Sequence, residues 1–337
     1  ATTTTRDSRR PAGTVTPSAR IESRTSASAP TVTSSQSTEP VMSADGAEAT
    51  IIDCQGTAQA PHRAFSFVSG ETANSVLDGF TITNGFAPSH PDYPIWPMGG
   101  GIRIASSSPS IRNCRFIANF ATNGGAGLAC VNGSNPSIQN CLFENNQATY
   151  GAGLYCYQAS SPSVNGCTFV NNSAEIDGGG TNCAYSSSPT ITSCVYIDNS
   201  AAIGGAIQCY GSSNAVLTNC TMVRNSADYG SAVSNNGSTS SVINSIIAFG
   251  SGNTVVNCVM GGACEISCSD AFGNANGDWV GCMESQADVN GNLSSNPQFC
   301  DASNNDLRIA ESSPCAPANN SCGILIGAMP TNPDCVF

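Results

Sequence analysis

Short apolar runs separated by polar turn residues repeat through the middle of the chain. The repeat interval is marked by cysteines, which lie 27, 26, 27 and 26 residues apart at Cys114, Cys141, Cys167, Cys194 and Cys220. Each repeat holds two runs of strand character, around "IxNCxF" and "GGAxLxC", with Ser, Asn, Gly and Pro between them. No stretch sustains a helical period. The pattern therefore predicts an all-β chain of stacked coils, each of about 26 residues.

Stacking coils in register turns each position of the repeat into a column of like residues. One column is expected to fill the core, and it consists of Phe116, Phe143, Phe169, Tyr196 and Met222. A second is expected to stack its amides at an inward turn, and it consists of Asn119, Asn146, Asn172, Asn199 and Asn225. A functional role for these asparagines is an alternative, but pairing with the turn backbone explains them without one.

The repeat motifs resemble those of a known class of solenoids. "GGAI" at 204–207, together with FxxN in "FIAN", "FENN" and "FVNN", is similar to the repeats of chlamydial polymorphic outer-membrane proteins. The coils as a whole resemble pectin-lyase-like right-handed β-helices of secreted bacterial proteins. Over roughly residues 50–250 the resemblance implies a right-handed parallel β-helix solenoid. It implies no single function, because this fold carries lyases, hydrolases, adhesins and fibre proteins.

Three regions are predicted along the chain. Residues 1–45 are rich in Ser, Thr and Pro, contain five arginines, and are read as an extended N-terminal arm. Residues 46–250 form the β-helix coils. Residues 251–337 hold eight cysteines in short loops and are read as Cys-rich terminal coils and a disulfide-rich cap. A fully extended arm of about forty residues reaches ~130 Å, far enough to contact another subunit.

An insertion at 86–98, "FAPSHPDYPIWPM", breaks the period. Its aromatic and imidazole side chains are candidates for a sugar platform or a partner contact, and they are Phe86, His90, Tyr93 and Trp96. The alternative, which we favour, is a cap packed on the flank of the solenoid.

The coil cysteines fall into two columns. From each cysteine of the column that starts at Cys130 to the next cysteine of the column that starts at Cys114, the separation is always 11 residues. The reverse separations vary between 15 and 16, so the constant step suggests disulfides within each coil. The expected pairs are Cys130–Cys141, Cys156–Cys167, Cys183–Cys194 and Cys209–Cys220. One coil has Asn235 and Ser245 instead, so both thiols are lost together. Vertical pairing along each column is the competing arrangement, because stacked strands also approach within disulfide reach.

Charge and composition narrow the partners. The net charge is −12 and all eleven cations are arginine, which argues against nucleic acid as a partner. Apolar runs such as "SVINSIIAFG" are too short to cross a bilayer. Eighteen cysteines without zinc-like spacing predict an oxidising compartment, and the start at Ala1 is interpreted as a processed mature form. The protein is therefore expected to be secreted, extracellular or at the cell surface.

Catalytic chemistry is not favoured by the sequence. β-Helix lyases use an Arg or Lys base with acidic calcium ligands, and hydrolases use paired carboxylates. The candidate acids near turns are read as a solvated edge, and they are Glu175, Asp177, Asp198 and Asp228. Neither His62 nor His90 has a triad-like setting. No catalytic residue, metal or cofactor is predicted, and disulfides explain the terminal cysteines better than metal binding does.

The sequence favours a structural role. We expect a subunit of an extracellular filament or surface assembly, polymerising head to tail through the β-helix ends and the arm. A carbohydrate-binding adhesin or a polysaccharide lyase is the alternative, so the partners expected are other copies of the chain and glycans. Six N-x-S/T sequons make glycosylation a further expectation, although chance yields several in such a sequence, and they are Asn132, Asn171, Asn219, Asn236, Asn292 and Asn319.

Overall fold

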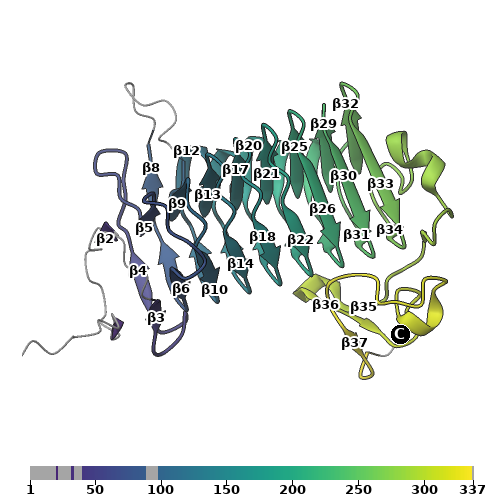
Figure 1. The fold of residues 1–337 in the computed structure, drawn as a ribbon. Coiled ribbons are helices and arrows are strands. Elements are labelled where there is room, and N and C mark those ends of the chain that lie inside the picture. The colour runs from purple at the N-terminus through teal and green to yellow at the C-terminus, as the bar shows by residue number, and fades with distance from the viewer. Residues whose placement is uncertain (1–19, 22–31, 34–39, 89–97, 336–337) are drawn as a thin grey trace, which may run out of the picture.

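The computed structural model describes residues 20–21, 32–33, 40–88 and 98–335. These residues form a right-handed parallel β-solenoid of about ten turns with almost no helix (Figure 1). The predicted fold class is confirmed. Each complete coil contributes one strand to each of four parallel sheets, which we name A, C, D and B in chain order.

Sheets A and C meet at the corner that carries the first cysteine column. Sheet A contains β1 (Arg20–Ile21), β3 (Val41–Ser43), β6 (Val76–Asp78), β10 (Ser110–Arg112), β14 (Ser137–Gln139), β18 (Ser163–Asn165), β22 (Thr190–Thr192), β26 (Asn214–Thr218), β30 (Thr239–Ile243) and β33 (Ala263–Ser267). Sheet C contains β4 (Ile51–Asp53), β7 (Thr81–Thr83), β11 (Arg115–Ile117), β15 (Leu142–Glu144), β19 (Thr168–Val170), β23 (Val195–Ile197), β27 (Thr221–Val223), β31 (Ile246–Ala248) and β34 (Asp270–Phe272).

Sheets D and B follow in each coil and are joined by the glycine-rich turn. Sheet D contains β8 (Phe86–Ala87), β12 (Phe120–Gly124), β16 (Gln147–Tyr150), β20 (Ser173–Asp177), β24 (Ser200–Ile203) and β28 (Ser226–Tyr229). Sheet B contains β2 (Val32–Thr33), β5 (Phe65–Phe67), β9 (Ile102–Ala105), β13 (Leu128–Val131), β17 (Leu154–Tyr157), β21 (Thr181–Ala184), β25 (Ile207–Tyr210), β29 (Val233–Asn236) and β32 (Val256–Val259).

The aromatic column lies in the core as predicted. Phe116, Phe143 and Phe169 are fully buried, and their rings stack with centroids 4.7 Å apart. Tyr196 continues the stack at 4.6 Å, and its hydroxyl lies 3.2 Å from the Thr181 hydroxyl, so the buried phenol has a hydrogen-bond partner. The in-register spacing of parallel strands therefore sets the ring spacing directly.

The asparagine column forms the predicted ladder between sheets C and D. In each step the Nδ2 of one asparagine donates to the Oδ1 of the next, at 3.0 Å from Asn119 to Asn146 and 2.9 Å from Asn146 to Asn172. The same Oδ1 accepts the backbone N–H of the previous asparagine, and Nδ2 also donates to a core carbonyl, as from Asn172 to Phe143. The ladder thus satisfies turn backbone groups that water cannot reach.

Two further columns do the same work at the other corners. Between sheets B and A, each serine hydroxyl accepts the backbone N–H of the serine one coil earlier, along Ser107, Ser134, Ser160, Ser187, Ser213 and Ser238. Between sheets A and C, the Cys141 N–H donates to the Cys167 Sγ at 3.4 Å. The Cys220 N–H donates to the Ser245 hydroxyl at 3.0 Å, so the serine replaces a thiol acceptor.

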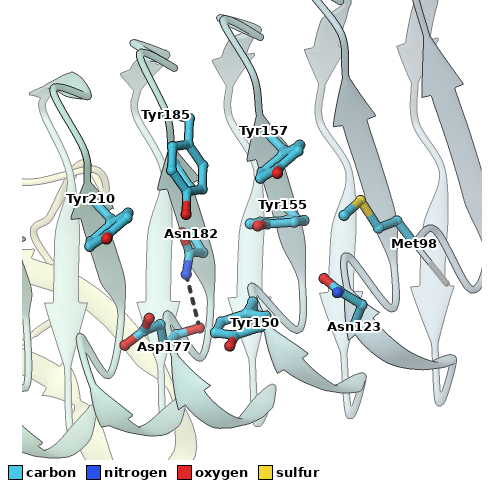
Figure 2. A pocket seen from close by; sticks show the side chains of 10 residues that line it. Met98, Asn123, Tyr150, Tyr155, Tyr157, Asp177, Asn182, Tyr185 and Tyr210 are labelled. Carbon is cyan, nitrogen blue, oxygen red and sulfur yellow. Dashed lines mark hydrogen bonds between the residues drawn. The ribbon is translucent and has the colours of Figure 1, made fainter. Parts of the chain in front are cut away.

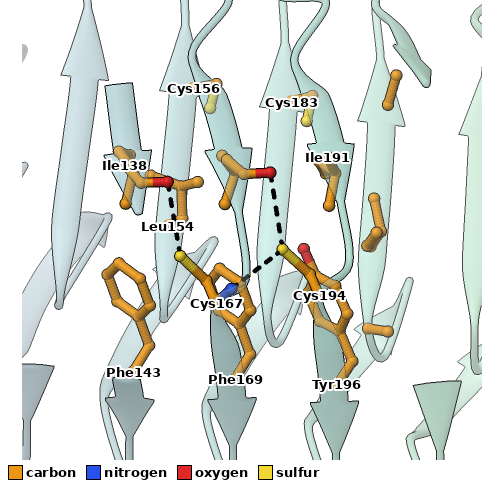
Figure 3. Close-up of a cluster of buried hydrophobic side chains, with 14 of the residues drawn as sticks. Ile138, Phe143, Leu154, Cys156, Cys167, Phe169, Cys183, Ile191, Cys194 and Tyr196 are labelled. Carbon is orange, nitrogen blue, oxygen red and sulfur yellow. Dashed lines mark hydrogen bonds between the residues drawn. The ribbon is translucent and has the colours of Figure 1, made fainter. Parts of the chain in front are cut away.

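The expected disulfides within a coil are not formed, and this prediction requires a correction. Cys130, Cys141, Cys156, Cys167, Cys183, Cys194, Cys209 and Cys220 are all buried free thiols. Their sulfur atoms interact along each column. Cys156 interacts with Cys130 and Cys183, and Cys167 interacts with Cys141 and Cys194. Figure 3 shows Cys167 and Cys194 beside Phe169 and Tyr196, whereas Cys156 and Cys183 lie on other strands. The two columns therefore lie apart, one within the strands of sheet B and the other at the corner between sheets A and C.

Burial also raises the pKa of thiols in both columns. Desolvation raises the pKa of Cys220 to about 12 and raises the pKa of Cys156 well above its ordinary value. Since the thiolate is the reactive form of cysteine, Cys156 and Cys220 are expected to be unreactive while the protein stays folded.

The terminal region closes the solenoid and folds back on its flank. Solenoid strands continue to β34, beyond the predicted boundary at residue 250, and η1 (Gly281–Gln286) then buries Met283 against the end of the core. A small sheet packs apolar side chains on the outer face of sheet C, and it contains β35 (Phe299–Asp301), β36 (Asp306–Ala310) and β37 (Thr331–Asn332), with η2 (Ala302–Asn304) and η3 (Pro317–Asn319) beside it. The predicted disulfide-rich cap is confirmed by Cys258–Cys282, Cys268–Cys322 and Cys300–Cys335.

Two short segments of the N-terminal arm are described, and both continue sheets of their own chain. The backbone of Arg20–Ile21 pairs in parallel with Met42–Ser43, and that of Val32–Thr33 pairs with Phe65–Ser66. These strands add to the first coils (Figure 1). The described parts of the arm thus extend the solenoid at the end where its first strands would otherwise be unpaired.

Replacing Asn172 with alanine is expected to lower the free energy of unfolding by about 3 kcal/mol. The change leaves the buried Asn146 N–H without its acceptor and removes the bonds from the Asn172 amide to Phe143 and Asn199, and an unsatisfied buried group costs about 1–3 kcal/mol. Asn165→Ala, at an exposed position of β18, is the control and is expected to cost about 0.5 kcal/mol or less. Equal shifts of the denaturation midpoint for both variants would contradict the ladder's role.

Thiol counting tests the cysteine columns. Alkylation of the denatured, unreduced protein is expected to label twelve of the eighteen cysteines, because six are paired near the C-terminus. Mass spectrometry reads the number directly. Disulfide-linked peptides that join Cys156 to Cys167 would instead show that disulfides form within a coil.

Candidate functional site

A groove lies on the flank of the solenoid, where the outer face of sheet B meets the ends of the sheet D strands. Its volume is about 330 Å³. Figure 2 shows tyrosine side chains along its length on successive coils. We call it the tyrosine groove, and its lining residues are Met98, Asn123, Tyr150, Tyr155, Tyr157, Asp177, Asn182, Ala184, Tyr185 and Tyr210.

Strand alternation places these side chains outside the core. In β17 the inward positions Leu154 and Cys156 are fully buried in the core, so Tyr155 and Tyr157 point to the opposite face. Register then aligns Tyr155 with Asn182 on β21. In sheet D, Tyr150 aligns with Asp177 beside a register irregularity, which brings both to the rim of the groove.

One glycine gives Tyr155 its space. A Cβ atom at Gly124 would lie 2.3 Å from the ring of Tyr155, a distance that no side chain can adopt. The glycine at the end of β12 therefore allows the ring to lie flat against the preceding coil. Tyr155 is only 5% exposed and packs with Met98 and Ala129, so it forms the floor of the groove.

The five tyrosines form a continuous aromatic chain. Ring centroids are 6.3 Å apart between Tyr150 and Tyr155 and 5.5 Å apart between Tyr155 and Tyr157. Edge-to-face contacts of 5.3 Å then join Tyr157 to Tyr185 and Tyr185 to Tyr210. Tyr185 is 50% exposed and Tyr210 is 37% exposed, so these two rings offer the accessible aromatic surface.

Polar groups lie beside the rings. Burial raises the pKa of the Asp177 carboxyl to about 6. The Nδ2 of Asn182 donates to the backbone carbonyl of Asp177 at 3.4 Å, while the Asn182 Oδ1 is buried without a hydrogen-bond partner. The Oδ1 of Asn123 is also buried without a hydrogen-bond partner. The groove thus combines aromatic surface with unused hydrogen-bond acceptors and one carboxylate.

Of the acids singled out from the sequence, Asp177 alone lines the groove. Glu175 and Asp228 are exposed. Asp198 forms an ion pair with Arg224 at 2.8 Å, and the same guanidinium donates to the Asn305 side chain in the terminal region. The interpretation of a solvated edge holds for the exposed pair and fails for Asp177, which is half-buried among tyrosines.

The predicted aromatic loop is only partly described. Phe86 belongs to β8 and stacks on Phe120 with centroids 4.8 Å apart, so it is part of the regular coil. His90, Tyr93 and Trp96 lie outside the described residues. Met98, the last residue of the predicted insertion, lines one end of the tyrosine groove.

The sequon asparagines differ in accessibility. Asn132 and Asn171 are exposed and Asn236 is half-exposed. Asn292 is buried, and its Nδ2 donates to the Ile266 and Gln286 carbonyls, so the folded chain does not present it for glycosylation. The amides of Asn219 and Asn319 also donate to backbone carbonyls. Glycosylation of the exposed sites remains a prediction.

Comparison with known proteins identifies the architecture. Residues 18–294 match a protein-family model described as a right-handed beta helix region. No curated protein and no solved structure matches the chain significantly. In the described ranges, no helix has the length and apolar character needed to span a membrane. Within the same ranges, no cluster of three or more His, Cys, Asp or Glu side chains is arranged to hold a metal ion.

Floor and rim tyrosines should differ in their contribution to stability. Tyr155→Ala is expected to lower the free energy of unfolding by about 3 kcal/mol, because it leaves a cavity against Met98 and Ala129. Tyr185→Ala removes a half-exposed ring and is expected to cost about 1 kcal/mol or less. Thermal and denaturant unfolding measure both, and a large loss for Tyr185→Ala would show that this ring is structural.

Proposed function

This chain belongs to the right-handed β-helix family, and we propose that it binds a glycan chain in the tyrosine groove. The fold fits a surface or polysaccharide-related protein, and the family includes lyases, hydrolases and proteins without enzymatic activity. The site, rather than the fold, must therefore identify the function.

The observation that carries the proposal is the row of five tyrosines with hydrogen-bonding groups beside it. Sugars offer flat apolar faces that pack on aromatic rings and hydroxyls that bond to amides and carboxylates. The accessible rings of Tyr185 and Tyr210 lie on neighbouring coils, and coils stack ~4.8 Å apart. That rise is close to the length of one pyranose unit in an extended polymer, so successive sugars can meet successive coils.

We propose that the groove binds the glycan without cleaving it. Glycoside hydrolysis uses two carboxyl groups on opposite sides of the scissile bond. Among the described residues that line the groove, Asp177 is the single carboxylate. An adhesin-like or glycan-anchoring role therefore fits the groove better than a lyase or hydrolase role.

Assembly into an extracellular filament stays a prediction. Head-to-tail stacking needs exposed strand edges at the ends of the solenoid. At one end β1 and β2 continue sheets A and B, and at the other η1 packs against the last coil. Because segments of the same chain cover part of both ends of the solenoid, we propose glycan binding ahead of filament formation.

A location outside the cell is part of the same proposal. Three disulfides near the C-terminus are compatible with an oxidising compartment. A groove that binds glycans also supports a location where polysaccharide is found. Secretion of the native protein, seen as its recovery from culture medium or the cell surface, is the supporting observation to seek.

Oligosaccharide binding tests the proposal directly. We expect an array of hexasaccharides to show binding to the wild-type protein, and calorimetry to show a loss of at least tenfold in affinity for the double variant Tyr185→Ala, Tyr210→Ala. Tyr229→Ala is the matched control, because this tyrosine is 49% exposed on β28 and lies outside the groove. Failure to bind any hexasaccharide, or an equal loss in the control, would contradict the proposal.

A further inference from the structure

The groove carries a negative charge that no cation described in the structure neutralises. The Asp177 carboxylate lies half-buried at the end of β20, and the four ion pairs of the described residues leave it unpaired. A partly buried carboxylate without a counter-ion costs free energy, and a cation bound beside it would offset that cost. The site is therefore incomplete without a positive group.

The neighbouring amides point to a hydrogen-bond donor. Asn182 is 2% exposed, and its Oδ1 has no partner; the Oδ1 of Asn123 also has none. Figure 2 shows both asparagines on the wall of the groove, with Asn182 above Asp177. An ammonium group offers three N–H donors and no acceptor, so it suits a carboxylate with unpaired amide oxygens beside it.

The tyrosine rings favour the same kind of group. The negative face of an aromatic ring attracts cations, and cages of aromatic rings recognise alkylated ammonium groups. Asp177 interacts electrostatically with Tyr155, whose neighbours in turn are Tyr150, Tyr157 and Tyr185. With a net charge of −12, the protein as a whole also attracts cations and repels polyanions.

The arginines near the groove lie toward its other end. The Nη1 of Arg63 donates to the Met98 carbonyl at 2.9 Å. Arg103 occupies the same outward column as Tyr155, two coils earlier along sheet B. A positive ligand group is therefore expected at the Asp177 and Tyr185 end, away from these guanidinium groups.

On the premise that the groove binds glycans, we propose that it selects oligosaccharides that carry free amino groups over neutral and acidic ones. The amino group lies against Asp177 with Tyr185 beside it, and the sugar rings continue over Tyr210. Glucosamine polymers are the simplest ligand class with this chemistry. Uronic acid polymers would bring a second carboxylate close to that of Asp177, and the two negative charges would repel each other.

The experiment compares three hexasaccharides of equal length by calorimetry at a pH slightly above the pKa of Asp177, which burial raises to about 6. The probes are the hexamers of glucosamine, N-acetylglucosamine and galacturonic acid. We expect the glucosamine hexamer to bind about tenfold more tightly than the N-acetylated one, with a preference that falls as salt is added. The galacturonic acid hexamer is expected to bind most weakly.

Two variants assign the preference to one residue. Asp177→Asn is expected to bring the affinities for the glucosamine and N-acetylglucosamine hexamers to within about twofold of each other, because it removes the charge that distinguishes the two ligands. Glu175→Gln removes the same charge from an exposed position of the same strand and should keep the preference. Circular dichroism checks that both variants are folded.

The outcomes separate the two levels of the proposal. If the N-acetylated or acidic hexamer binds as tightly as the amine, the amino-group preference is overturned while glycan binding stands. A preference that survives Asp177→Asn, or disappears in Glu175→Gln, overturns the role of Asp177. If no hexasaccharide binds, glycan binding fails and the preference fails with it.

Discussion

The hydrogen bond that one coil makes with the identical residue of the next coil is the interaction on which this structure depends. A coil has four corners, and each corner turns backbone N–H groups toward an interior without water. At three of these corners the Asn119-to-Asn225 ladder, the serine column and the cysteine column supply side-chain acceptors for these groups. Because the acceptor must recur at the same position, the repeat length cannot drift, and the stacked rings of Phe116, Phe143 and Phe169 fall into line.

A rigid interior also frees the outer positions for other uses. Cys156 must face inward for the core, whereas its neighbours Tyr155 and Tyr157 face outward and line the groove. Register with the next coil then sets Tyr150 beside Asp177 and Tyr157 beside Tyr185 without any loop having to fold around a ligand. The site is therefore preorganised, which reduces the entropy lost when an oligosaccharide binds.

The sequence predicted those features that repeat with the coil. The fold, the phenylalanine column and the asparagine ladder were all visible because each column keeps one residue type. The disulfide prediction failed because a constant separation of 11 residues measures distance along the chain and not the direction of the side chains. The exchange of Cys for Ser245 was the better signal, since a hydroxyl replaces a thiol as an acceptor but not as half of a disulfide. The groove was missed because its tyrosines form no unbroken column. Tyr157 and Tyr210 occupy the same position but are separated by Ala184, and Tyr185 lies one position beyond Ala184 on β21.

The most direct measurement is a crystal structure of the protein soaked with a glucosamine oligosaccharide. The proposed site predicts sugar density along the tyrosine groove, with a ring packed on Tyr185 or Tyr210 and an amino nitrogen within hydrogen-bonding distance of the Asp177 carboxylate. Density for the oligosaccharide on another face of the solenoid, with the groove empty, would contradict it.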